Sequence, residues 1–180
     1  MPNSICFAGG GIDKTDEQRD WIDFLKKHKV SLDELRRKPG TKKPFIFDQP
    51  DGLLDRETSL RITAIRETFE ELGVIFCRDS NEPQSSPFST FFHTKDCDIP
   101  DWQKKIHDHE VSLMAFCEKF KVVPDVTNIH EWSVWLTPTF FRPKRFETAF
   151  FLVALNDFPP VYPEAHEVQE FQVDNLTQIS

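Results

Sequence analysis

Residues 66–74 read Arg-Glu-Thr-Phe-Glu-Glu-Leu-Gly-Val and bring three carboxylates close together. At 100° per residue in a helix, Glu67, Glu70 and Glu71 fall within one arc of roughly 100°. The apolar side chains of the stretch fall on the opposite side: Ile62, Ile65, Phe69 and Leu72. Carboxylate oxygens at this spacing suit Mg²⁺ or Mn²⁺, and such ions assist the attack of water on phosphate groups. The alternative is a solvated helix surface, which is the commoner fate of charged runs.

A helix must hold these carboxylates, and the sequence marks both of its ends. Asp55 or Thr58 can cap its first turn, and Gly73 can take the left-handed conformation that ends a helix after Leu72. Three adjacent carboxylates repel one another by up to about 1 kcal/mol per pair in water, so we expect a positive group to offset them. Residues 74–77 read as a buried strand that follows the helix.

The stretch resembles the second half of the Nudix box, Arg-Glu-U-x-Glu-Glu-x-Gly-U, where U is aliphatic; only Thr68 departs from it. The first half has two candidates. Gly52 stands in the usual register, but Thr58 then occupies the acidic position. The run from Phe7 to Gly10 instead resembles the Phe-Pro-Gly-Gly entry, and its acidic position falls on Asp16. That second candidate predicts a box split by a long insertion, at about residues 17–57.

A split box resembles the peroxisomal acyl-coenzyme A diphosphatase branch of the Nudix hydrolases. Further matches to this branch lie outside the box: residues 1–4, Trp21, Arg61 and Ile62, and residues 130–138, 145–151 and 159–163. The resemblance implies hydrolysis of coenzyme A and acyl-coenzyme A to 3′,5′-ADP and 4′-(acyl)phosphopantetheine, with Mg²⁺ or Mn²⁺ as cofactor. It leaves open another nucleoside diphosphate derivative as substrate, such as ADP-ribose or a dinucleotide, or an inactive binding module.

The resemblance also assigns roles to residues. Glu67, Glu70 and Glu71 are the expected metal ligands, with Glu67 as the candidate base and Arg66 orienting Glu67 through an ion pair. Gly9 and Gly10 are expected to shape the backbone beside the metal. Two acidic residues are further candidates: Asp16 for the outer carboxylate of the box and Glu167 for a distal one.

The resemblance implies an α+β fold, a Nudix-type α/β/α sandwich with a mixed sheet, formed by residues 1–180 as a single domain. We expect its first strand or strands to be missing, because the chain begins where that segment normally ends. Periodicity predicts helices at about 16–28 and 100–120, the second a family-specific decoration. It predicts strands at 129–136, 146–155 and 168–173. His107 and His109 should point apart on the second helix, which disfavours a joint metal site.

The composition limits the classes of ligand and the cellular location that we expect for this protein. The net charge of −8 over 180 residues argues against nucleic acid and favours a metal-bridged small molecule. Four widely spaced cysteines without a Cys-x-x-Cys pair predict reduced thiols and an intracellular protein. No apolar run approaches the ~20 residues that span a bilayer. Peroxisomal residence follows from the resemblance alone, since the chain ends Thr-Gln-Ile-Ser without a peroxisomal signal.

One basic patch stands out in this acidic chain. It lies within the predicted insertion: Arg36, Arg37, Lys38, Lys42 and Lys43. We expect either a solvated loop or, if the insertion folds beside the site, a binding surface for the 3′-phosphate of coenzyme A.

Overall fold

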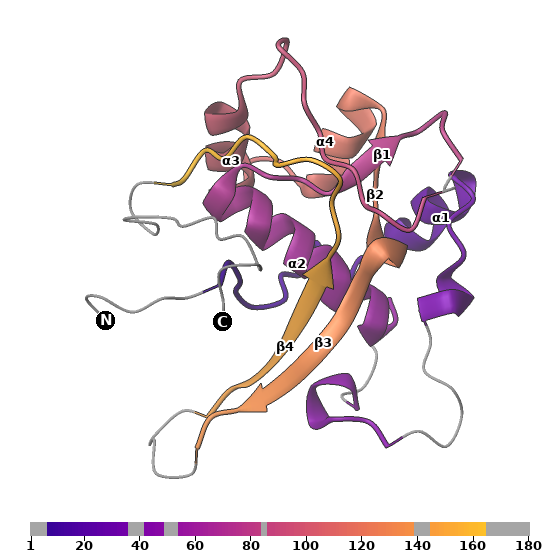
Figure 1. The fold of residues 1–180 in the computed structure, drawn as a ribbon, viewed down its shortest axis with the longest axis vertical. Helices are drawn as coiled ribbons and strands as arrows, with labels where there is room; N and C mark the ends of the chain where they lie inside the picture. The colour runs from indigo at the N-terminus through magenta and orange to yellow at the C-terminus, as the bar shows by residue number, and fades with distance from the viewer. Residues whose placement is uncertain (1–6, 36–41, 49–53, 84–85, 139–144, 165–180) are drawn as a thin grey trace.

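The computed structural model describes residues 7–35, 42–48, 54–83, 86–138 and 145–164 (Figure 1). Four α-helices lie in these ranges: α1 (Asp20–Lys27), α2 (Arg56–Leu72), α3 (Ile99–His107) and α4 (Leu113–Phe120). The strands are β1 (Cys77–Asp79), β2 (Val122–Pro124), β3 (Ile129–Leu136) and β4 (Glu147–Val153). Short 3₁₀ turns lie at Leu32–Leu35, Phe45–Phe47 and Val126–Asn128. The α+β class expected from the sequence is confirmed.

Helix α2 runs through the middle of the molecule, and its two ends form as the sequence predicts (Figure 1). Asp55 is the N-cap, and its carboxylate accepts a 3.0 Å hydrogen bond from the backbone N–H of Thr58. Gly73 ends the helix with φ of 68°, where a side chain would be strained. The helix therefore carries residues 66–71 on its last turns, as expected.

The described strands form two antiparallel pairs, β1 with β2 and β3 with β4. A single parallel contact between described residues joins Ser89 to Leu155 as an isolated bridge. Arg61 fixes α2 against the longer pair, because its Nε atom donates to the carbonyl of Ile129 at 3.0 Å while its guanidinium lies over the ring of Phe151. The β3–β4 ribbon thus packs on the helix that carries the carboxylates.

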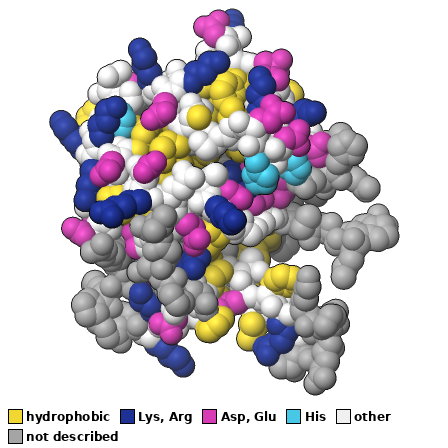
Figure 2. Space-filling model, turned by 180° about the vertical axis from the view of Figure 1, so that it is seen from behind, with side chains coloured by type: hydrophobic (Ala, Val, Ile, Leu, Met, Phe, Trp, Pro, Cys, Tyr) yellow, Lys and Arg dark blue, Asp and Glu magenta, His cyan; other side chains and the backbone are white. Residues whose placement is uncertain are grey.

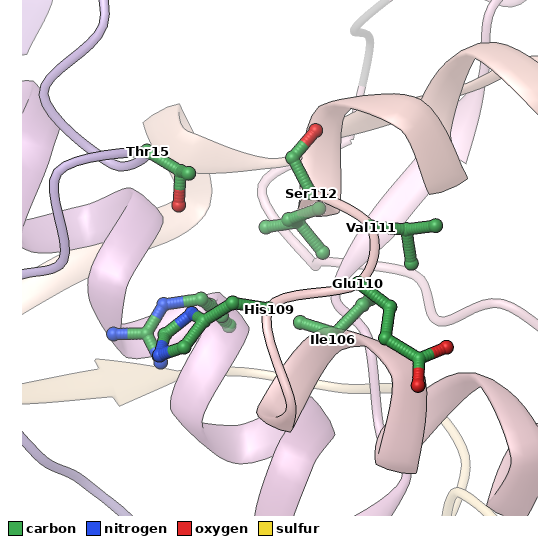
Figure 3. A pocket seen from close by; sticks show the side chains of 8 residues that line it. Thr15, Ile106, His109, Glu110, Val111 and Ser112 are labelled. Atoms are coloured by element: carbon green, nitrogen blue, oxygen red, sulfur yellow. The ribbon is translucent and has the colours of Figure 1, made fainter.

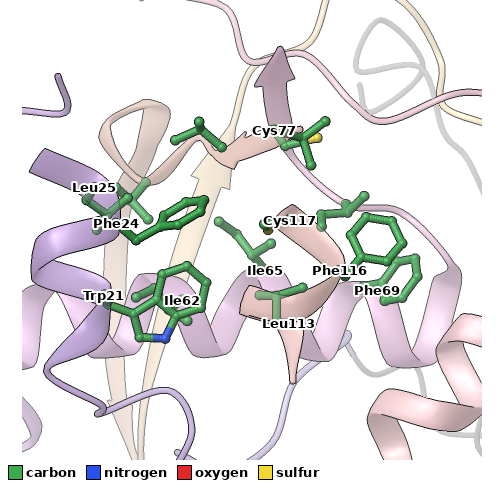
Figure 4. Packing of buried hydrophobic residues seen from close by; sticks show 14 of the residues in the cluster. Trp21, Phe24, Leu25, Ile62, Ile65, Phe69, Cys77, Leu113, Phe116 and Cys117 are labelled. Atoms are coloured by element: carbon green, nitrogen blue, oxygen red, sulfur yellow. The ribbon is translucent and has the colours of Figure 1, made fainter. Parts of the chain in front are cut away.

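The hydrophobic core fills the space between α2, α1 and α4 (Figure 4). Ile62, Ile65 and Phe69 of α2 are fully buried and meet Trp21 of α1 and Phe116 of α4 in one cluster. Burying a large apolar side chain contributes roughly 1.5–3 kcal/mol. The predicted buried face of α2 is confirmed for these three residues, and this packing fixes how the opposite face is presented.

Several predicted elements differ in their bounds. The expected helix at 100–120 is wrong as a single helix: it is two helices, because His109 has φ of 57° and Ser112 caps α4 by accepting from the N–H of Ala115. The strand expected at 74–77 begins at Cys77, and the helix expected at 16–28 is shorter. The strands expected at 129–136 and 146–155 are confirmed as β3 and β4.

Two of the predictions from the sequence are not tested by the described residues. The strand predicted at 168–173 lies outside the described residues, and the assignment of residues 1–180 to one domain stays a prediction. Cys77, Cys97 and Cys117 are free thiols, as expected of reduced cysteines. No helix in the described ranges has both the length and the apolar character that crossing a membrane requires.

Candidate active site

Arg66 is the centre of the candidate site. Its Nη2 atom lies 2.8 Å from Oε1 of Glu67, and its Nη1 atom lies 3.0 Å from Oε1 of Glu70. The Nε atom donates to both oxygens of Asp16 at 3.1 Å, and Nη2 also donates to the carbonyl of Gly11 at 2.9 Å. The structure therefore contains the ion pair expected between Arg66 and Glu67. It also supplies the positive group that the adjacent carboxylates require.

Asp16 is the buried anchor of this network. Only 1% of its surface is exposed, and its Oδ2 atom accepts hydrogen bonds from the hydroxyl of Thr63 and the N–H of Asp13. Thr58, the other candidate for the acidic position of the box, instead binds the capping carboxylate of Asp55. Of the two candidates for the first half of the box, only the one that begins at Phe7 therefore places its acidic position, Asp16, in contact with Arg66. Since both oxygens of Asp16 are taken by protein donors, this carboxylate orients Arg66.

The glycine turn at residues 9–11 packs directly on the carboxylate face of α2. A Cβ atom added at Gly10 would lie 2.5 Å from Oε1 of Glu67, whereas Gly9 and Gly11 face open space. The N–H of Gly9 donates to Oε1 of Glu71 at 3.0 Å. Gly9 and Glu71 thus meet although 62 residues separate them in the sequence, and the role predicted for Gly10 has a steric basis.

The three glutamates of the box differ in their surroundings. Glu70 is only 7% exposed, because it packs between Arg66 and helix α3. Glu67 and Glu71 are partly exposed. Burial raises the pKa of the Glu67 carboxyl above its ordinary value, although the charge of Arg66 works against the rise. A raised pKa suits a carboxylate that takes up a proton.

Arg66 remains a permanent cation in this setting. Burial alone would lower its pKa, but the hydrogen bond and charge of Asp16, followed by the charge of Glu70, raise the pKa of the Arg66 guanidinium above its usual value. Asp16, Glu67 and Glu70 carry three formal negative charges against this single positive charge. The surplus favours the approach of a further cation.

The predicted metal ligands do not converge on one point in this arrangement. Within the described ranges, no group of three His, Cys, Asp or Glu side chains is close enough to hold a metal ion. The reason lies in their present partners: Glu70 binds Arg66, and Glu71 accepts from Gly9. Their carboxylate oxygens are nevertheless the donors that Mg²⁺ and Mn²⁺ prefer. Holding one ion would require rotation of the side chains of Glu70 and Glu71.

Two histidines also border the site. The Nδ1 atom of His107 lies 3.8 Å from Oε2 of Glu70, and that of His109 lies 3.9 Å from Oδ2 of Asp13. Figure 2 shows histidine side chains beside a group of acidic ones on one face of the molecule. The two histidines lie near different carboxylates, and only His107 belongs to helix α3. No local sequence signal places His107 beside Glu70, because this contact comes from the packing of α3 on α2.

A small cavity lies next to Arg66, where the connection between α3 and α4 faces the turn at Thr15 (Figure 3). His109, Glu110 and Ser112 line it from that connection. Its volume of about 90 Å³ is well below the ≈ 300–1,000 Å³ of ordinary ligand pockets. The cavity is therefore too small for a nucleotide.

The basic patch of the predicted insertion and Glu167 are the remaining candidate site residues. Lys43 pairs with Glu57 at 3.6 Å, ten residues before Glu67 on α2. Since a helix rises 1.5 Å per residue, Lys43 lies about 15 Å from the carboxylate cluster. Arg36, Arg37, Lys38 and Glu167 lie outside the described residues. Among the described basic residues of the patch, Lys43 therefore gives no support to a 3′-phosphate site beside Glu67.

Known proteins carry the same domain. The curated relatives include acyl-coenzyme A diphosphatase NUDT19 of Homo sapiens, 33% identical over 96% of this chain and 49% of the relative. The protein of that name from Gallus gallus is 31% identical over 89% of this chain and 46% of the relative. A putative nudix hydrolase 7 of Caenorhabditis elegans is 26% identical over 95% of this chain and 41% of the relative. No solved structure matches this chain.

The chain spans about half the length of the curated relatives it matches. The family described as the NUDT19 Nudix domain matches residues 1–179, a range that contains the glycine turn, Asp16 and the carboxylates around Arg66. The chain belongs to the NUDT19 Nudix domain family.

Proposed function

We propose that this domain hydrolyses the diphosphate of coenzyme A and acyl-coenzyme A, giving 3′,5′-ADP and 4′-(acyl)phosphopantetheine. The observation that carries the proposal is the Arg66 network, which holds the partly exposed Glu67 carboxylate against the glycine turn. The relatives named acyl-coenzyme A diphosphatase support the choice of substrate. Intracellular, peroxisomal residence and the absence of a nucleic-acid partner remain predictions from the sequence.

The carboxylates of Glu67, Glu70 and Glu71 would hold Mg²⁺ or Mn²⁺. When bound, such an ion neutralises charge on the phosphoryl oxygens and lowers the pKa of water. Glu67 would accept the proton of the attacking water, whose oxygen forms a bond to one phosphorus as the bridging P–O bond breaks. Arg66 would keep the Glu67 carboxylate in place, and Asp16 would keep Arg66 in place. Gly10 leaves the space in which that carboxylate sits.

A substrate panel tests the proposal. Purified protein is incubated with Mg²⁺ or Mn²⁺ and with coenzyme A, an acyl-coenzyme A, ADP-ribose and a dinucleotide, and the products are identified by mass spectrometry. We expect 3′,5′-ADP from the first two substrates, at rates above those for the others. Faster cleavage of ADP-ribose or the dinucleotide would instead identify another Nudix diphosphatase. Tight binding of coenzyme A without any product would identify a binding module.

A further inference from the structure

The last turn of α2, which carries Glu70 and Glu71, is held by donors from outside the helix. Its final internal bond runs from the N–H of Gly73 to the carbonyl of Phe69. The carbonyls that follow have no partner within a helix and need other donors. Backbone N–H groups of the distant segment 162–164 supply two of them: Tyr162 donates to Leu72 and Glu164 to Glu71, each at 2.8 Å.

Gln103 of α3 supplies the third donor. Its side-chain Nε2 atom donates to the carbonyl of Glu70 at 3.1 Å and to the carbonyl of Tyr162 at 2.8 Å. A side-chain amide has two N–H donors, so both are used. With 5% of its surface exposed, Gln103 is a buried link between the carboxylate turn and the segment that caps it.

A second residue of α3 reaches the same glutamate. His107 follows Gln103 by four residues and therefore lies on the same face of the helix. Its ring is 3.8 Å from the carboxylate of Glu70, while Gln103 binds the backbone of that residue. Helix α3, expected from the sequence to be decoration, therefore contacts Glu70 at both its main chain and its side chain.

We infer that Gln103 is a positioning residue of the active site, acting through the backbone of Glu70 and Glu71; the inference rests on the proposed function. The position of each carboxylate depends on the backbone of its turn, and misplacement near 1 Å costs about 100-fold in rate. Without the amide, the carbonyls of Glu70 and Tyr162 lose a buried donor. The turn and the segment 162–164 then keep only the two backbone bonds from Tyr162 and Glu164. The carbonyl of Glu70 loses its donor, so the backbone that sets the spacing of the carboxylates is held less firmly.

The variant Gln103→Met tests this role, because it keeps the length of the side chain and removes the donor. We expect its Kd for Mn²⁺, measured by calorimetry well below the melting temperature, to rise by about 10- to 100-fold, as is typical when residues that support metal ligands are replaced. The kcat for coenzyme A should fall by a similar factor, with a smaller change in KM. The control Val123→Ala removes buried methyl groups from β2 and should lower Tm without changing the Kd for Mn²⁺.

A second measurement does not depend on whether the variant folds. In the unmodified protein, Mg²⁺ should slow amide hydrogen exchange at Tyr162 and Glu164, because ligands that order the turn also order the donors bound to it. Failure of the unmodified protein to bind Mn²⁺ or cleave coenzyme A would overturn the proposed function. If the unmodified protein binds Mn²⁺ and cleaves coenzyme A, either of two results would overturn the role of Gln103. One is an unchanged Kd for Mn²⁺ in folded Gln103→Met, and the other is an amide exchange rate at Tyr162 and Glu164 that Mg²⁺ does not change.

Discussion

Gly10 touches Glu67 so closely that a Cβ atom at residue 10 would lie 2.5 Å from the Glu67 carboxylate. The substitution Gly10→Ala therefore forces the carboxylate to move, and we expect the rate of diphosphate hydrolysis to fall about 100-fold or more. Thermal unfolding should change little, because the clash is with the end of a side chain.

The neighbouring glycines provide matched controls for Gly10→Ala. A Cβ atom at Gly9 or Gly11 would meet no atom within 4 Å. We expect Gly9→Ala and Gly11→Ala to keep nearly full activity. Equal losses of activity in all three variants would show that the turn needs general flexibility, and would contradict the steric account of Gly10.

Asp16→Asn should destabilise the protein. Asp16 and Arg66 form a buried ion pair at 3.0 Å, but Arg66 keeps Glu67 and Glu70 as partners, so we expect a cost of about 1–3 kcal/mol from the lost charged hydrogen bonds. Glu17→Gln is the control, because the ion pair of Glu17 with Arg56 is more exposed and worth about 1 kcal/mol or less. The free energy of unfolding in urea measures both. A loss below 1 kcal/mol for Asp16→Asn would refute the anchoring role.

The sequence predicted the carboxylate helix well because its signals are local. The cap at Asp55, the end at Gly73 and the apolar spacing of Ile62, Ile65 and Phe69 all involve neighbours in the chain. The burial of Glu70 cannot be read from this local pattern, because it depends on α3, whose Gln103 lies 33 residues further along the chain.

The break between α3 and α4 was missed for a different reason. It requires a left-handed His109, and Ser112 as a cap inside an otherwise helical pattern. The position of Asp16 on Arg66 could be expected only from the family register, since 49 residues separate the two in the chain and no local pattern links them.

Glu67→Gln should make the metal-free protein more stable at neutral pH. The folded-state pKa of Glu67 lies above its ordinary value, so the folded protein holds this proton more tightly than the unfolded chain does. The stability that the protonated Glu67 carboxyl contributes to the folded state is present in acid, and it is lost as the pH rises through the folded-state pKa. Glutamine avoids that loss, because it does not titrate.

Melting curves in a chelator, recorded from acid to neutral pH, test the charge of Glu67. The variant Glu67→Gln should melt above the unmodified protein at pH 7, and the difference should shrink as the pH falls toward the ordinary carboxyl value of 4.5. A variant that melts below the unmodified protein at every pH would show that the ion pair with Arg66 outweighs the burial of Glu67.

Glu70→Gln and Glu71→Gln should both weaken Mn²⁺ binding, but only the first should weaken the fold. We expect Glu70→Gln to cost about 1–3 kcal/mol of stability, because it removes the charge of a buried partner of Arg66. Glu71 is partly exposed, so Glu71→Gln should stay within about 0.5 kcal/mol. Full activity of either variant at limiting Mg²⁺ would contradict its role as a metal ligand.

The most direct measurement compares the release of 3′,5′-ADP from coenzyme A by the unmodified protein and by Glu67→Gln at saturating Mg²⁺. We predict measurable turnover for the unmodified protein and a loss of about 100-fold or more for the variant, as expected when a general base is removed. Both proteins must be shown to be folded by their melting curves. Equal rates for the two folded proteins would contradict the assignment of catalysis to the Arg66–Glu67 pair.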